Sequence, residues 1–105
     1  MNFKELAENL GLEEDEFQEI VELFLETSDA DLHKLRSAID REDTQQAIEA
    51  AHSIKGASGN LGFMAISEKA KNVEIKAREK DLSGANEAVE NIKKEVDRIA
   101  QALKT

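Results

Sequence analysis

The sequence has no cysteine, proline, tryptophan or tyrosine, and four phenylalanines are the only aromatic residues among its 105 positions besides two histidines. The lack of cysteine excludes disulfides and thiolate metal sites. The lack of proline removes the residue that most often interrupts a helix, so long continuous helices are possible.

Long hydrophobic runs are also missing. No apolar stretch approaches the roughly 18 residues that a membrane-spanning helix needs, and the N-terminus lacks the basic-then-apolar layout of a signal peptide. Charged residues make up 35% and hydrophobic residues 40% of the chain, which is typical of a soluble helical protein. A chain of 105 residues favours one domain, residues 1–105, and its simplest location is the cytoplasm.

Basic residues are scarce in the first third of the chain. Residues 1–31 hold eleven of the 23 acidic residues and one of the 14 basic residues, and the net charge of the whole chain is −9. This balance argues against nucleic acid or an anionic membrane as a partner. The simplest interpretation of the acidic segment is a solvated helix face.

Apolar residues recur at steps of three and four through nearly the whole chain, a spacing typical of amphipathic helices. The stripe of the longest helix includes Phe17, Ile20, Val21 and Phe24. The pattern predicts an all-α fold, an antiparallel up-down-up-down four-helix bundle with a short additional N-terminal helix across one end. The expected short helix covers about 2–10, and the expected bundle helices cover about 13–40, 44–60, 63–80 and 83–103.

The two histidines differ in their surroundings. His33 lies one residue off the apolar stripe of its helix, with only Asp29 as a candidate co-ligand, so a boundary or surface role is favoured over a metal site. His52 is expected at the edge of the core, reachable from solvent. The residues that share its helix face are Ile48, Glu49, Lys55, Gly56 and Gly59.

The surroundings of His52 suit phosphoryl chemistry. A neutral imidazole, whose unperturbed pKa is about 6.5, is a competent nucleophile at neutral pH. Lys55 at i+3 would neutralise part of the charge of a phosphoryl group on the ring. Gly56 would leave room for a partner protein. Because the chain has no glycine-rich phosphate loop and no kinase-like residue set, it would carry phosphate between proteins rather than make or hydrolyse it.

Other interpretations stay open from spacing alone. His52 and Lys55 could be an ordinary surface pair, and Gly59 could be a helix cap. Gly56 fits this view least well, because glycine inside a helix costs about 1 kcal/mol relative to alanine and the helical pattern continues to Leu61. A helical interaction module without phosphate is the alternative function, whereas a metal or cofactor bundle lacks the repeated Glu and His ligands that such sites use.

The stretch HSIKGASGNLG, residues 52–62, resembles the His-x-x-Lys-Gly-x-x-x-x-x-Gly signature of histidine-containing phosphotransfer (HPt) domains of two-component phosphorelays. The resemblance extends to the length, the helix order and the acidic N-terminal segment. It implies that His52 is phosphorylated, that Lys55 stabilises the phosphoryl group and that Gly56 gives the partner close access. Gly62 would belong to the turn before the next helix.

The same resemblance implies the partners. These are response-regulator receiver domains and a hybrid sensor histidine kinase, with Mg²⁺ on the receiver and neither a cofactor nor a metal on this chain. We expect a monomer and a stand-alone protein, with a terminal domain of a hybrid kinase as the alternative. Ile48, Gly59, Ser28 and Lys71 are the predicted partner contacts, although each could equally fill or border the core.

Overall fold

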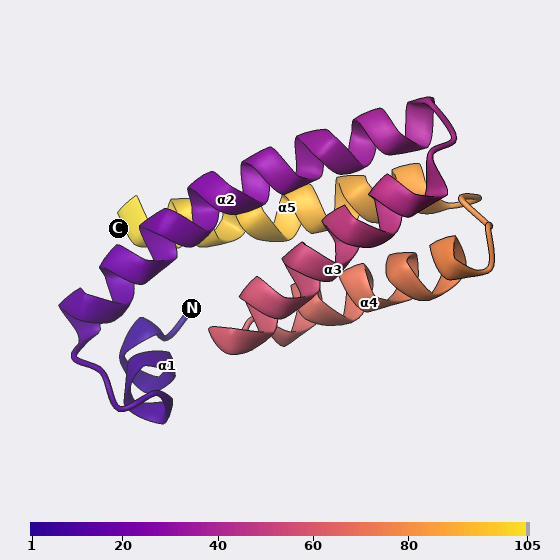
Figure 1. The fold of residues 1–105 in the computed structure, drawn as a ribbon. Coiled ribbons are helices and arrows are strands. Elements are labelled where there is room, and N and C mark those ends of the chain that lie inside the picture. The colour runs from indigo at the N-terminus through magenta and orange to yellow at the C-terminus, as the bar shows by residue number, and fades with distance from the viewer. Residues whose placement is uncertain (105) are drawn as a thin grey trace.

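The computed structural model describes residues 1–104 and contains no strand among them. Helices α2 to α5 form the bundle, and α1 lies across one end beside the start of α2 (Figure 1). Helix α3 contacts α2 and α4, and α5 contacts the same two helices, so α3 and α5 are diagonally opposed. The all-α prediction is confirmed. The five helices are α1 (Phe3–Asn9), α2 (Glu14–Asp40), α3 (Thr44–Asn60), α4 (Met64–Arg78) and α5 (Ala85–Lys104).

The helix ends follow from local chemistry. Asp43 caps α3 by accepting a hydrogen bond from the main-chain N–H of Gln46 at 3.0 Å, as an N-terminal aspartate does. Helix α4 ends at Arg78, two residues before the expected boundary, because Lys80 turns the chain with a φ of 61°. Helix α5 begins two residues later than expected, after Gly84 at a φ of 76°.

Aromatic rings join the short helix to the bundle. Phe17 lies 6.1 Å from Phe3 and 6.3 Å from Phe63 between ring centroids, and Phe63 lies 5.3 Å from Phe24. Ile20 does not belong to this core, contrary to the expected stripe, because 39% of it is exposed. The other large, fully buried aliphatic side chains are Leu35, Ile54, Ile66, Ile92, Ile99, Val21 and Val89.

Gly62 makes the sharp turn between α3 and α4. Its φ is 85°, in the left-handed region that favours glycine, and an added Cβ would lie 3.1 Å from the Leu6 side chain. The N–H of Phe63 bonds back to the Ser58 carbonyl at 2.9 Å and closes the helix end. A side chain at position 62 would therefore strain the turn that sets α4 against α3.

Within residues 1–104, no helix combines the length and the hydrophobicity required to span a membrane.

Candidate functional site

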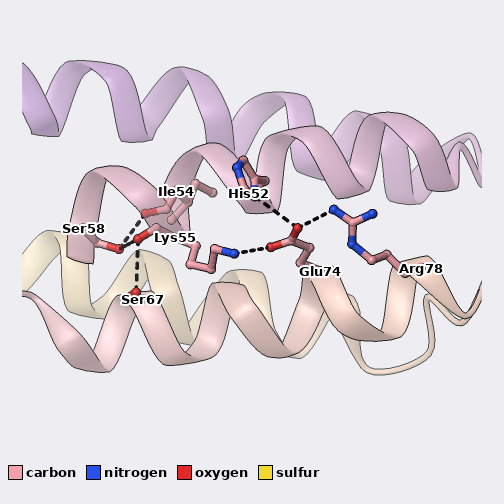
Figure 2. A network of polar contacts seen from close by, with 7 residues as sticks. All are labelled: His52, Ile54, Lys55, Ser58, Ser67, Glu74 and Arg78. Carbon is pink, nitrogen blue, oxygen red and sulfur yellow. Dashed lines mark hydrogen bonds and ion pairs between the residues drawn. The ribbon is translucent and has the colours of Figure 1, made fainter. Parts of the chain in front are cut away.

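His52 lies midway along α3 with its side chain 63% exposed. Its Nδ1 is 3.1 Å from Oε2 of Glu74, which comes from the neighbouring helix α4. The ring is therefore anchored at Nδ1 by Glu74 (Figure 2), and its exposure leaves the rest of the ring open to solvent. His33, the second histidine, lies on the exposed surface of α2.

Glu74 is the centre of an ion-pair cluster that spans α3 and α4. Its side chain is 6% exposed, and its Oε1 pairs with Lys55 Nζ at 2.9 Å. Its Oε2 pairs with the Arg78 guanidinium at 2.8 Å as well as with His52. Figure 2 shows the three basic side chains converging on this one carboxylate. Neither Glu74 nor Arg78 is predicted from the sequence as a site residue.

The cluster fixes the protonation of Glu74. Burial raises the pKa of this carboxyl, but hydrogen bonds from Lys55, Arg78 and His52 outweigh burial and lower it to about 2. An ionised carboxylate can only accept hydrogen bonds. The proton on the neutral His52 ring is thus assigned to Nδ1, which leaves the Nε2 lone pair free.

Stability at low pH tests this cluster. The folded pKa of Glu74 is about 2 against an ordinary 4.5, so its contribution to stability is complete above about pH 4.5 and is lost as the pH falls through 2. Glu74→Gln cannot bind that proton. The free energy of unfolding in urea, measured between about pH 5 and about pH 2, should therefore fall more steeply for the wild type than for Glu74→Gln. Parallel curves would contradict the assigned ionisation.

Lys55 is held on both its side chain and its main chain. The ammonium binds Glu74, and the side chain keeps 32% exposure. The Lys55 carbonyl accepts hydrogen bonds from the Ser67 hydroxyl of α4 at 3.1 Å and from the Ser58 hydroxyl at 3.2 Å. These contacts place a positive charge beside the imidazole while leaving part of it accessible to a ligand.

Two glycines of α3 have different surroundings. Gly56 is exposed, and a Cβ added there would meet nothing within 4 Å. Gly59 is half-buried, and its Cβ would lie 3.2 Å from the Ser67 hydroxyl. Close packing against α4 therefore accounts for Gly59 without a partner contact, whereas no packing among residues 1–104 accounts for Gly56.

The remaining predicted partner contacts occupy different environments. Ser28 is 2% exposed and its hydroxyl donates to the Phe24 carbonyl of the same helix, so a docked protein cannot reach it and the prediction for Ser28 is wrong. Ile48 is half-buried against the core. Lys71 lies on the exposed surface of α4, three residues before Glu74.

An apolar groove lies between α2 and α3. It begins about one turn after His52, and on the α2 side it exposes 39% of Ile20 and 61% of Leu23. We call this surface the α2–α3 groove; it is lined by Ile20, Leu23, Phe24, Thr27, Ala57, Asn60 and Leu61.

No group of three or more His, Asp or Glu side chains within residues 1–104 is arranged to hold a metal ion. The charged cluster at His52 instead combines a single carboxylate with three basic groups, an arrangement that suits an incoming anion.

Fold and site together define a helical bundle that presents an anchored, solvent-open histidine beside a carboxylate that also pairs with two cations. Residues 19–102 match the model of the family described as Hpt domain, so the chain belongs to the Hpt family and its function is histidine phosphotransfer in a phosphorelay. The fold is similar to the crystal structure of histidine-containing phosphotransfer protein B (HptB) from Pseudomonas aeruginosa PAO1, with a TM-score of 0.85 and 29% identity over 94% of this chain and 86% of that chain. Comparison with curated proteins gives no match.

Proposed function

We propose that His52 is the phosphorylated residue and that the protein carries the phosphoryl group from one receiver-domain aspartate to another. The observation that supports this most directly is the anchored ring, with Nδ1 held by ionised Glu74 at 3.1 Å and Nε2 directed away from that contact. A fixed ring with a free lone pair is a pre-positioned nucleophile.

The transfer step follows from this geometry. The Nε2 lone pair attacks phosphorus while the bond from phosphorus to the receiver's carboxylate oxygen breaks, and its electron pair stays on that carboxylate. Lys55 and Arg78, both already beside the ring through Glu74, offset the negative charge of the phosphoryl group. The receiver would supply Mg²⁺, and this chain would act as a carrier that is itself phosphorylated rather than as a kinase.

The partner surface would extend from His52 over Gly56 into the α2–α3 groove. An apolar groove whose α3 residues begin about one turn after His52 favours protein docking, and the open space at Gly56 lets a partner's backbone approach the ring. Receiver domains and a hybrid sensor kinase are the partners that we propose, with the protein acting as a monomer in the cytoplasm.

Labelling tests this function. The full chain is incubated with a phosphorylated receiver domain and Mg²⁺, and phosphate on the bundle is then tested for lability in acid and stability in base. We expect labelling with that profile, because a phosphorus–nitrogen bond at histidine breaks in acid. If no receiver donor labels the chain, the protein would be a helical interaction module without phosphate chemistry.

Lys55→Ala should slow transfer from a phosphorylated receiver by about tenfold or more, because a hydrogen bond to a charged group contributes about 1.5–3 kcal/mol and about 1.4 kcal/mol corresponds to a factor of ten in rate. Rapid-quench transfer kinetics measure this effect, and circular dichroism checks the fold. Lys94→Ala removes an exposed lysine from α5, diagonally opposite α3, and should transfer at the wild-type rate. Equal rates for Lys55→Ala and the wild type would remove Lys55 from the mechanism.

A further inference from the structure

We propose that Glu74 keeps a proton on Nδ1 of His52 throughout the phosphorylated state, so that the ring remains a cation and releases its phosphoryl group readily. This inference rests on the proposed function, and it assigns Glu74 a positioning role that goes beyond holding the fold.

The carboxylate is fixed in place from several directions. Its side chain is 6% exposed, Lys55 holds Oε1 at 2.9 Å, and Arg78 holds Oε2 at 2.8 Å. The oxygen that Arg78 holds also faces Nδ1 at 3.1 Å. A carboxylate held this firmly cannot turn away when the ring becomes phosphorylated, so its negative charge stays beside Nδ1.

The negative charge of Glu74 affects how readily the phosphoryl group leaves the ring in the next transfer. When Nε2 bonds to phosphorus, no proton leaves Nδ1, and the ring acquires a positive charge beside the dianionic phosphoryl group. If Nδ1 then loses its proton, the imidazole must depart as an anion in the next transfer, which is unfavourable. If Nδ1 keeps its proton, the phosphorus–nitrogen bond breaks with its electron pair returning to Nε2, and a neutral imidazole remains.

The charges around the ring act in opposite directions. Glu74 accepts from Nδ1 and favours the ring cation, whereas Lys55 and Arg78 disfavour it. Both cations are themselves paired with Glu74, so their charges are already partly neutralised and oppose the ring cation less than unpaired cations would. On neighbouring turns, the charged residues Glu49 of α3, Lys71 of α4 and Asp31 of α2 are all more exposed than Glu74, and Asp31 already accepts from the Ser53 hydroxyl at 2.6 Å.

The pH profile of transfer separates this role from a structural one. Wild type and Glu74→Gln are phosphorylated with phosphoramidate, and the rate of transfer to an unphosphorylated receiver with Mg²⁺ is measured from about pH 6 to about pH 9, the range around imidazole titration. Gln keeps the size and an accepting oxygen but removes the charge. The decline in rate at high pH should occur about one to three pH units lower in Glu74→Gln, the displacement that a neighbouring opposite charge produces.

Arg78→Gln removes a cation from the same cluster and should move the decline upward, the direction opposite to that of Glu74→Gln. Nitrogen-15 spectra of the phosphorylated wild type provide a second test without any variant, since Nδ1 should remain protonated at about pH 8, above the ordinary imidazole range. Coincident pH profiles for wild type and Glu74→Gln, or an unprotonated Nδ1, would overturn this inference and leave the proposed function intact. Failure of the receiver to accept phosphate from the loaded wild type would instead overturn the proposed function, and this inference with it.

Discussion

His52→Gln should abolish phosphorylation by a phosphorylated receiver while leaving the bundle folded. Glutamine offers no nucleophilic ring nitrogen, so the loss of labelling should be complete rather than partial. The side chain is 63% exposed and contributes nothing to the buried core, so the free energy of unfolding should change by less than about 1 kcal/mol. Labelling with a phosphorylated receiver measures the first effect, and urea denaturation measures the second.

His33→Gln provides the matched control, because it makes the same substitution at the exposed histidine of α2. It should accept phosphate at the wild-type rate. Acid-labile phosphate that persists in His52→Gln but disappears in His33→Gln would move the site to α2. Phosphate that persists in both variants would show that His52 is not the only acceptor and would contradict the assignment.

The helices could be predicted because local signals agree with the overall pattern. Helix α3 begins after the Asp43 cap and ends just before the Gly62 turn, and both residues are visible in the sequence as cap and turn formers. The two boundaries that differ by two residues from the expected ones, at Arg78 and Ala85, flank one loop in which Lys80 adopts a left-handed φ of 61°. A lysine carries no sequence signal for that conformation, so the end of α4 could not be located from the pattern.

Glu74 could not be identified because its role depends on two helices at once. In the sequence it is one of 23 acidic residues, next to the buried Val73. Its contact with His52 joins positions 22 residues apart, and this contact exists only because α4 is rotated so that Glu74 faces α3. Sequence periodicity finds the apolar stripe of each helix but not the rotation that pairs a charge on one helix with a ring on another.

Helix α2 shows the opposite case, because the burial of Ser28 is predictable from helical spacing. Ser28 lies four residues after the buried Phe24 and four before the buried Leu32, so helical spacing places it on the core face. Its hydroxyl is satisfied by the Phe24 carbonyl, which removes the cost of burying it. The three- and four-residue spacing also places Ile20 on the apolar stripe, but Ile20 lines the α2–α3 groove.

Gly56→Leu should make the protein more stable and less active at the same time. Replacing a glycine inside a helix with leucine stabilises the helix by about 0.8–1 kcal/mol, and no atom within 4 Å of the new Cβ opposes this gain. The added side chain would project one turn after His52, where a receiver must approach. Transfer from a phosphorylated receiver should slow by at least about tenfold, which is about 1.4 kcal/mol of lost transition-state stabilisation.

Phosphorylation by phosphoramidate shows whether Gly56→Leu impairs docking of the receiver or the reactivity of the His52 ring. Phosphoramidate is small enough to reach Nε2 past a leucine, so Gly56→Leu should be phosphorylated by it at the wild-type rate and then fail to transfer to the receiver. Gln101→Leu adds the same side chain to an exposed position on α5, away from α3, and should transfer normally. If Gly56→Leu transferred phosphate to the receiver at the wild-type rate, the open space at Gly56 would serve no partner. Slow loading by phosphoramidate would instead show that the substitution disturbs the histidine, and the glycine would then belong to the chemistry of the site rather than to recognition.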